Sequence, residues 1–322
     1  MAKNQKQGMS AGLLAAVCIF IVVLSALLGR YFYLREMYHG EAVAYSRNAV
    51  KSLKEGSFDY KLARTFYTDD EWDALFDEDF AISERTDEEA EPIEVIHISG
   101  STYEGYMMLV HHPEDVYVAV NPNMNNGQQA PSLEDYVKMN KAVAGINAGG
   151  FEDAGGTGNG GLAWGIVIHE GKLISGNMNT FLPIIAIDKD LKLMCVDATA
   201  ADALKWGAQE AVTFGPTFIN NYEVVYKDGD GDYPMLNPRT AIGQAGDGTF
   251  LLLVLDGRGP SSFGALYEDV IKILRSYDAQ TAANLDGGNS TAMIYKGKYV
   301  NTTVSMYGSR HLPTVFLVKG DE

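Results

Sequence analysis

The sequence predicts an α+β fold with a large, mostly antiparallel sheet and a few flanking helices, preceded by one transmembrane helix and an acidic stalk. Two observations predict the sheet. From Ile93 onward, apolar residues recur in short runs with a period of two, which is typical of strands that bury one face. These runs do not alternate strictly with helical segments and no repeat is present, so neither a doubly wound sheet nor a TIM barrel is expected.

The expected strands are short and are separated by turn residues. They cover residues 93–98, 106–111, 116–120, 143–146, 164–168, 184–187, 191–196, 212–214, 223–226, 249–255, 292–295 and 314–318. Glu170-Gly171-Lys172 and Lys296-Gly297-Lys298 stand between neighbouring runs and predict hairpin turns. Helical spacing predicts three helices, over residues 132–141, 197–204 and 263–277.

The composition limits the classes of partner. The chain has 322 residues, and 25 Lys and Arg against 42 Asp and Glu give a net charge of −17. Because nucleic-acid-binding proteins need a basic face for the phosphate backbone, no nucleic-acid partner is expected. Cys18 lies in the apolar N-terminal segment and Cys195 lies far away in the soluble part, which argues against an intrachain disulfide.

No metal or other cofactor is expected. The cysteines and histidines do not show the spacing of a zinc site. Asp228-Gly229-Asp230-Gly231-Asp232 resembles the start of a calcium-binding loop, but Arg239 stands where an EF-hand needs its bidentate glutamate. An acidic hairpin turn is therefore the expected structure, and an adventitious calcium site is the alternative.

The N-terminal segment 11–29 is uncharged and almost wholly apolar. A helix of this length spans about 28 Å, close to the hydrocarbon thickness of a bilayer, and predicts an uncleaved signal anchor. A cleaved signal peptide is the alternative, although a clear A-x-A site is missing. The expected organisation is a cytoplasmic tail at 1–10, a transmembrane anchor at 11–29, a helical and acidic stalk at 30–91, and a domain at 92–322. The protein is thus expected in the cell membrane, single-pass, with this domain outside the cytoplasm.

The strongest functional signal is a set of small polar residues and glycines that follow apolar runs. In Asn284-Leu285-Asp286-Gly287-Gly288-Asn289, a strand-like run ends in a carboxylate beside two glycines, where a ligand can approach the backbone closely. Comparable stretches are Asn147 to Gly150, Gly215 to Thr217 and Asp256 to Arg258, and Arg239-Thr240 precedes a further apolar run. Loops of one domain that carry such residues are expected to meet at one pocket.

The order of these stretches resembles a known family. INAGGF at 146–151, GNGG at 158–161, WGIVI at 164–168, TFGPTFI at 213–219, PRTAIGQ at 238–244, LLLVLDGR at 251–258, AANLDGGNST at 282–291 and YGSRHLPTVFLV at 307–318 are together similar to the phosphodiester glycosidase domain. The resemblance implies cleavage of the bond between a sugar's anomeric carbon and a phosphodiester, typically of N-acetylglucosamine-1-phosphate. The sequence departs from the family pattern at Glu152 and Asp153, which replace an aromatic residue, and at Asn289.

The resemblance also implies a set of site residues. The positions that match the family are Asn147, Arg239, Thr240, Asp256 and Asp286 with Gly287 and Gly288. Cleavage at the anomeric carbon builds oxocarbenium charge, so a nearby carboxylate is useful as nucleophile or as base for water. Asp286 is the first choice for this carboxylate and Asp256 the second, with a strand-end cap as the alternative interpretation of Asp256.

A guanidinium is expected on the departing phosphate, because arginine offers two parallel N–H donors to such an anion. Arg239 is preferred for this role over Arg310 and Arg258. Asn147 would hold a sugar hydroxyl or acetamido group, or else be a satisfied amide at a strand end. The remaining substrate-binding candidates are Gly149, Gly150, Thr217, Thr240, Gly287, Gly288, Ser290 and Arg310.

The expected function is hydrolysis of a sugar-1-phosphodiester in a cell-envelope or extracellular polymer or glycoconjugate. A carbohydrate-binding or envelope-assembly protein without turnover is one alternative, and a transglycosylase that uses the same pocket is another. A serine hydrolase based on Ser290 is disfavoured because the G-x-S-x-G turn is missing.

Overall fold

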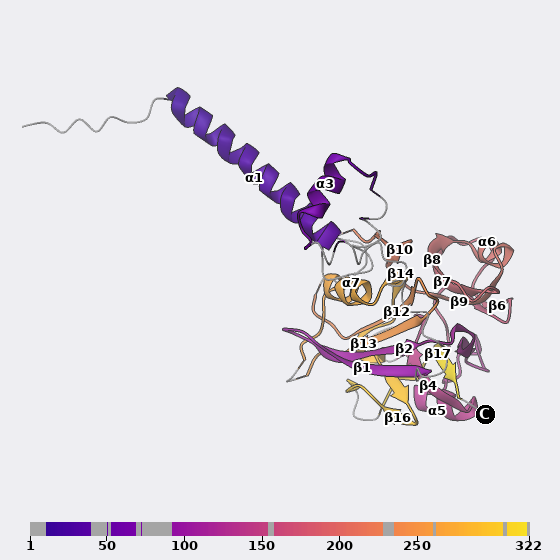
Figure 1. Cartoon of the computed structure of the whole chain (residues 1–322). Helices are drawn as coiled ribbons and strands as arrows, with labels where there is room; N and C mark the ends of the chain where they lie inside the picture. Colours follow the sequence, from indigo (N-terminus) through magenta and orange to yellow (C-terminus); the bar gives the residue numbers. More distant parts are fainter. Residues whose placement is uncertain are drawn as a thin grey trace, which may run out of the picture. The chain divides into compact units, whose positions relative to one another are not determined.

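The computed structural model describes residues 11–39, 50, 53–68, 72, 92–153, 158–227, 235–259, 262–304 and 308–320 (Figure 1). The chain divides into two compact units, Met1–Ser83 and Glu84–Glu322. Asp228 to Asp232, the segment with calcium-loop character, lies outside the described residues.

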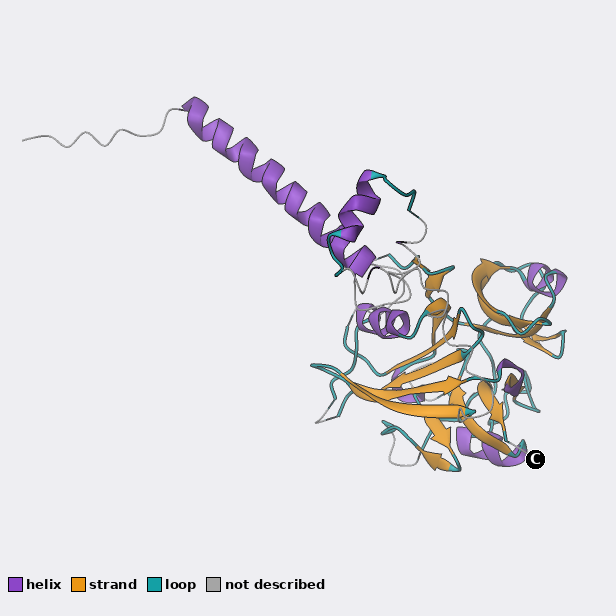
Figure 2. Ribbon diagram, viewed as in Figure 1, coloured by secondary structure: helices purple, strands orange, loops and turns teal. Residues whose placement is uncertain are grey.

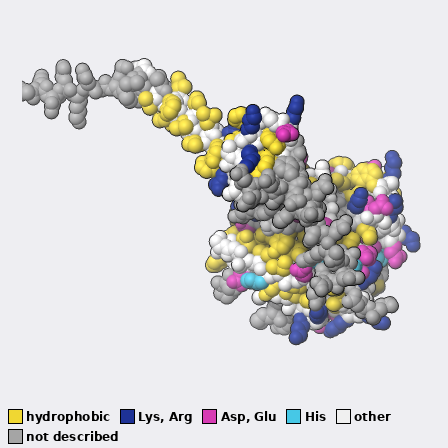
Figure 3. All heavy atoms as spheres, in the orientation of Figure 1, with side chains coloured by type: hydrophobic (Ala, Val, Ile, Leu, Met, Phe, Trp, Pro, Cys, Tyr) yellow, Lys and Arg dark blue, Asp and Glu magenta, His cyan; other side chains and the backbone are white. Residues whose placement is uncertain are grey.

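The N-terminal unit is dominated by helix α1 (Ala11–His39). Its stretch Val17–Arg35 is long and apolar enough to cross a membrane, and apolar side chains cover this part of the helix (Figure 3). A signal sequence of similar length and composition would share these properties. The structure therefore shows an apolar N-terminal helix where the sequence predicts one.

A small apolar cluster follows α1 in the same unit. Helix α3 (Phe58–Arg64) begins at Ser57, whose side chain accepts a hydrogen bond from the Tyr60 backbone at 3.1 Å. The cluster consists of Leu34, Tyr38, Val50, Ala63 and Trp72. The segment expected to be a stalk thus begins with a small core of its own. Most of its acidic part, residues 73–91, lies outside the described residues.

The C-terminal unit contains three sheets, and every strand pair among its described residues is antiparallel (Figure 2). Sheet A has the order β1 (Ile93–Ser99), β2 (Glu104–Val110), β13 (Phe250–Leu255), β12 (Arg239–Ala245), β14 (Ala279–Leu285), β10 (Thr217–Asn220) and β11 (Glu223–Val224). Sheet B has the order β16 (Lys298–Tyr299), β15 (Met293–Tyr295), β4 (Ala142–Asn147), β17 (Thr314–Lys319) and β3 (Val116–Val120). Sheet C has the order β6 (Lys172–Ser175), β5 (Val167–His169), β9 (Ala208–Thr213), β7 (Leu182–Asp188) and β8 (Leu193–Ala198).

Few helices accompany these sheets. They are α5 (Leu133–Met139), α6 (Ala200–Lys205) and α7 (Tyr267–Ser276), together with the short 3-10 helices η2 (Pro113–Asp115) and η4 (Gly288–Ser290). Val270 and Leu274 of α7 pack with Ala241 of β12 and Ala282 of β14. Helix α7 therefore covers one face of sheet A.

The three sheets share one main core. Met108 of β2, Leu252 of β13, Ile146 of β4, Phe316 of β17 and Ile185 of β7 are buried in a single apolar cluster. The start of β12 pairs with the end of β14, and Asn147 at the end of β4 bonds to Asp286 just after β14. The polar residues at these strand ends are therefore close together.

The α+β expectation is confirmed, with differences in detail. The strands divide into three sheets instead of one, as is common when a strongly twisted sheet would become too wide. Residue Asp197 belongs to β8, not to a helix, because it pairs with Pro183 of β7. Helix α7 starts at Tyr267, later than expected, because the backbones of Phe263 and Ala265 bond to neighbouring loops.

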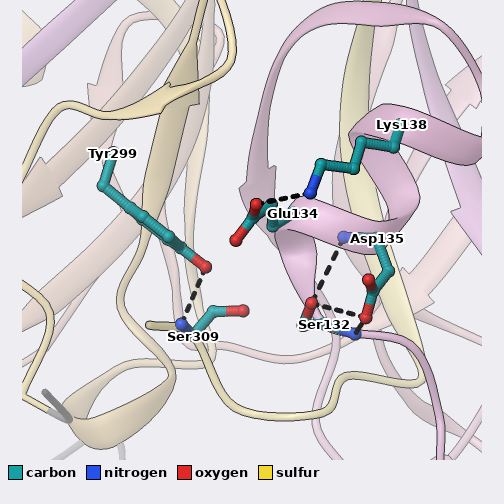
Figure 4. Close-up of polar contacts among 6 residues, drawn as sticks. All are labelled: Ser132, Glu134, Asp135, Lys138, Tyr299 and Ser309. Atoms are coloured by element: carbon teal, nitrogen blue, oxygen red, sulfur yellow. Dashed lines mark hydrogen bonds and ion pairs between the residues drawn. The ribbon is translucent and has the colours of Figure 1, made fainter. Parts of the chain in front are cut away.

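The start of α5 illustrates how local polar contacts tie the fold together (Figure 4). The Ser132 hydroxyl accepts from the Asp135 backbone at 3.2 Å, and the Asp135 carboxylate accepts from the Ser132 backbone at 3.0 Å, which completes a capping box. The bonds from Ser132 lower the pKa of Asp135. The Leu133 backbone donates to Ser309 Oγ at 2.8 Å, and the Ser309 backbone donates to the Tyr299 hydroxyl at 2.9 Å. These bonds attach the segment before β17 to the helix.

We predict that Phe316→Ala lowers the free energy of unfolding by about 3–5 kcal/mol, because it empties a site in the shared core. Phe263→Ala is the matched control, since Phe263 is 62% exposed while Phe316 is 1% exposed. Urea denaturation of the full chain measures both. Equal losses in the two variants would contradict the shared core.

Candidate active site

A pocket of about 510 Å³ lies in the C-terminal unit. Its lining consists of Gly150, Phe151, Asp153, Trp164, Pro183, Phe214, Gly215, Pro216, Tyr267 and Asp286. These residues come from the segments that follow β4 and β14, the segments before β5 and β10, and the first residues of β7 and α7. The pocket thus combines aromatic walls with two carboxylates, a composition suited to a polar ligand that has apolar faces.

Two buried side chains beneath the pocket position Asp286. The Asn147 amide donates a hydrogen bond to the backbone carbonyl of Asp286, and the Asp286 backbone donates to Ala148 at 3.0 Å. The Asn147 side-chain oxygen accepts from the Thr240 hydroxyl at 2.8 Å and from the Ala292 backbone at 3.2 Å. Asn147 and Thr240 are fully buried. They join the ends of β4, β12 and β14 and thereby fix where Asp286 stands.

The Asp286 carboxylate is largely enclosed by protein and partly exposed to the pocket. Burial raises its pKa to about 7, although hydrogen bonds from Ser290 and the Gly287 backbone favour the ionised form. The nearby charges act in opposite directions, since Arg310 lowers this pKa and Asp153 raises it. A carboxyl group that titrates near neutral pH is suited to proton transfer.

The two glycines after Asp286 shape the turn. A side chain at Gly287 would meet the Pro238 carbonyl at 2.8 Å, and Gly288 has a φ of +59°, which L-residues rarely adopt. The Gly288 backbone donates to that same Pro238 carbonyl at 2.9 Å. Their small size is therefore needed to turn the chain sharply below the pocket.

Asp153 and Arg310 form a second charged group at the pocket. Arg310 donates to both carboxylate oxygens of Asp153, at 2.5 and 2.7 Å, and to the Gly158 carbonyl at 2.9 Å. Its guanidinium lies over the Phe151 ring, 4.7 Å from the centroid. The hydrogen bond from Arg310 lowers the pKa of Asp153. Two carboxylates of opposite character, Asp286 and Asp153, thus line one pocket.

Arg239, the residue preferred for the phosphate, is not among the described residues that line the pocket. Its side chain is buried and donates to the backbone carbonyls of Ala265 at 3.0 Å and Met235 at 2.7 Å. The guanidinium stacks on the Tyr267 ring at 4.2 Å from the centroid. Arg239 therefore packs on Tyr267, a ring that lines the pocket, and its guanidinium hydrogen bonds go to backbone carbonyls.

Asp256 also differs from its expected place beside the anomeric carbon. Its carboxylate accepts from the Asn301 amide at 2.9 Å and from the Thr302 backbone at 3.0 Å. It is not among the described residues that line the pocket. The Asp256 carboxylate thus caps the turn at Asn301 and Thr302, whereas the alternative interpretation was a cap at the end of its own strand.

The remaining candidates divide between the pocket and its support. Gly150 lines the pocket, and Thr217 follows the lining residue Pro216. Gly149 is buried, where an added side chain would lie 3.0 Å from Val212. Ser290 is buried and bonds to Asp286 instead of facing the pocket as a free nucleophile. Arg258 is exposed and donates to the side chains of Asn289 at 2.6 Å and Asn237 at 2.8 Å.

Most residues that line the pocket were not among the site residues predicted from the sequence. The unanticipated lining residues are Phe151, Asp153, Trp164, Pro183, Phe214 and Tyr267. Phe151, Trp164 and Phe214 stand in stretches that resemble the family, and Asp153 stands where the sequence departs from it, but none of these was predicted to face the pocket. Large aromatic side chains are highly buried on average, so their place in an apolar run does not indicate a pocket wall.

Comparison with known proteins decides the family. The family model for phosphodiester glycosidases matches residues 140–319, which is more than half of the chain. The chain belongs to the phosphodiester glycosidase family.

The individual proteins that the chain is similar to are distant in sequence. The catalytic domain of zebrafish N-acetylglucosamine-1-phosphodiester alpha-N-acetylglucosaminidase, in a form auto-inhibited by its pro-peptide, aligns with a TM-score of 0.61 at 20% identity, covering 73% of this chain and 85% of that one. A putative exported protein of Burkholderia pseudomallei aligns with a TM-score of 0.50 at 15% identity, covering 68% and 74%. The SPbeta prophage-derived protein YomE of Bacillus subtilis is 28% identical over 172 residues, which is 51% of this chain and 26% of YomE. The match spans about a quarter of YomE, and the solved structures show the shared fold.

We predict that Asp286→Asn makes the C-terminal unit more stable above pH 7. A folded-state pKa of about 7, above the ordinary value of 3.8, means that folding takes up a proton between these pH values. The stability that this group contributes is present below about pH 4 and is lost as the pH rises through about 7. In Asp286→Asn this pH-dependent loss of stability should be absent. Thermal melts of the variant and the wild type at pH 5 and pH 8 would measure it.

An Asp286→Asn melting temperature that differs from wild type by the same amount at both pH values would contradict the raised pKa. Asp190→Asn is the control, because Asp190 is exposed on the turn between β7 and β8.

Proposed function

We propose that the C-terminal unit hydrolyses the C1–O bond of a sugar-1-phosphodiester, of the N-acetylglucosamine-1-phosphate type, in a cell-envelope or extracellular polymer. The observation that carries this proposal is the Asp286 carboxyl group, with a pKa of about 7, at the wall of an aromatic pocket that also contains the ionised Asp153. Membership of the family and the name of the zebrafish enzyme support the choice of substrate class.

Ionised Asp286 is assigned as the base that activates water at the anomeric carbon. A phosphate leaving group departs as an acidic oxygen, so it needs little proton donation. The charge that develops on the sugar ring in the transition state is positive, and negative carboxylates near it are favourable. Asp153 supplies a permanent negative charge at the same pocket, because Arg310 keeps its pKa low.

Arg310 takes the role first assigned to Arg239. Its charge acts on Asp286, and it contacts two lining residues, Asp153 and Phe151. A phosphoryl oxygen that leaves the anomeric carbon would be stabilised by this cation. Asn147 and Thr240 are assigned as positioning residues that hold the Asp286 backbone.

We further propose that α1 anchors the protein in the cell membrane as a single span, with the C-terminal unit outside the cytoplasm. The apolar stretch Val17–Arg35 supports this assignment. After cell fractionation, the full chain should stay in the membrane pellet at alkaline pH, and protease added to intact spheroplasts should digest the C-terminal unit. Recovery of a shortened, soluble chain would instead show a cleaved signal peptide.

We predict that Asp286→Asn loses about 10²–10⁴-fold in kcat/KM, the range typical of a general base. Release of sugar from N-acetylglucosamine 1-(methyl phosphate) by the full chain measures the rate. Asp256→Asn is the comparison, since its carboxylate caps a turn, and it should keep most of the activity. Unchanged turnover in Asp286→Asn would overturn the assignment.

The pH dependence gives a separate prediction. Because ionised Asp286 is the active form, kcat/KM should rise with pH and level off above about 7. A rate that falls as the pH passes 7 would show that protonated Asp286 is the active form and that it acts as an acid. Arg310→Lys should keep this pH dependence in shape while lowering kcat/KM, because the cation remains but the two parallel hydrogen bonds that hold it to Asp153 are lost.

A further inference from the structure

One wall of the pocket carries a large aromatic side chain that faces solvent. Trp164 lines the pocket, yet it is 47% exposed. The Phe151 ring is covered by the Arg310 guanidinium, and the Tyr267 ring is covered by Arg239. Within the described part of the chain, no such cation or second ring stacks on Trp164, so its indole is available to a ligand.

The backbone around Trp164 is rigidly placed. Its backbone donates to the Gly150 carbonyl at 2.9 Å, and its ring lies against Gly150, where an added side chain would come within 3.5 Å of it. The next residue, Gly165, has a φ of +77°, and a side chain there would meet Thr213 at 2.6 Å. The Ile166 backbone then donates to Thr213 Oγ1 at 2.8 Å. The backbone contacts before and after Trp164 therefore determine where its ring lies and keep it exposed.

The apolar surface continues beyond the pocket. Leu162, two residues before Trp164, is 37% exposed. Phe181 is 66% exposed and precedes Pro183, another lining residue, by two positions. Two lining residues thus have exposed apolar neighbours in the sequence, and exposed apolar surface beside a pocket is typical of a binding surface.

We propose that Leu162, Trp164 and Phe181 form a second sugar subsite at the rim, with Trp164 as its stacking platform, so that the enzyme acts on a chain of hexosamine units. The proposal rests on the proposed function of the pocket. The flat C–H face of an equatorially linked sugar is electropositive at its hydrogens and stacks on the electron-rich face of an indole. A chain of such sugars presents a flat ribbon, which matches an open apolar rim better than it matches a closed cavity.

The test measures binding in the Asp286→Asn background, so that turnover does not interfere. The probes are N-acetylglucosamine and its β-1,4-linked tetramer, chitotetraose, titrated calorimetrically into the full chain. The tetramer should bind about tenfold more tightly than the monomer, the increment expected for one stacked ring. Trp164→Ala should lose this increment while keeping its affinity for the monomer within about twofold.

Trp206→Ala is the matched control. Trp206 is 49% exposed at the end of α6, and it is not among the described residues that line the pocket. This variant should keep the tenfold increment, and the melting temperature of each variant reports whether it is folded. Trp164→Phe, which keeps an aromatic face, should recover most of the increment.

The proposal is overturned if monomer and tetramer bind equally, if neither binds, or if Trp164→Ala and Trp206→Ala lose the same amount. A change in oligomeric state of Trp164→Ala without any change in sugar binding would also overturn it, because the rim would then be a protein contact. Failure of the proposed function is distinct, since the wild-type chain would then release no sugar from N-acetylglucosamine 1-(methyl phosphate), whatever the binding result.

Discussion

The candidate site depends on the hydrogen bonds of one buried amide. The Asn147 side chain bonds to the Asp286 backbone, to the Thr240 hydroxyl and to the Ala292 backbone. It therefore joins strands of two different sheets at the point where they end. Because a buried amide is costly to leave without partners, this arrangement fixes the three chain segments against one another. The direction in which Asp286 enters the pocket follows from that arrangement.

The two carboxyl groups at the pocket, Asp286 and Asp153, have surroundings that favour different protonation states. Asp286 is enclosed, which disfavours its ionised form, while Asp153 is held ionised by Arg310. Such a separation of two carboxyl pKa values is how a site obtains different protonation states at one pH. The acidic balance of the chain as a whole plays no part in this separation, which is local.

The sequence predicts the elements better than it predicts their meeting points. Period-two runs predict antiparallel strands, and the glycines after Asp286 predict a sharp turn at a strand end, both of which follow from local chemistry. The position of a guanidinium relative to a pocket does not follow from local chemistry, since it depends on how distant loops pack against one another. Arg239 follows the family pattern but stacks behind Tyr267, whereas Arg310, far along the chain, reaches the pocket through its pair with Asp153. In the same way, the exposure of Trp164 depends on Gly150 and Gly165, which carry no aromatic or polar signal of their own.

The central claim is that the fold holds Asp286 at the pocket with a carboxyl group that titrates near neutral pH. The most direct measurement is the ¹³C chemical shift of the Asp286 carboxyl carbon as a function of pH, assigned by its disappearance in Asp286→Asn. The account predicts a single titration with a midpoint near pH 7. A midpoint near 4, the ordinary value for an exposed aspartate, would contradict it.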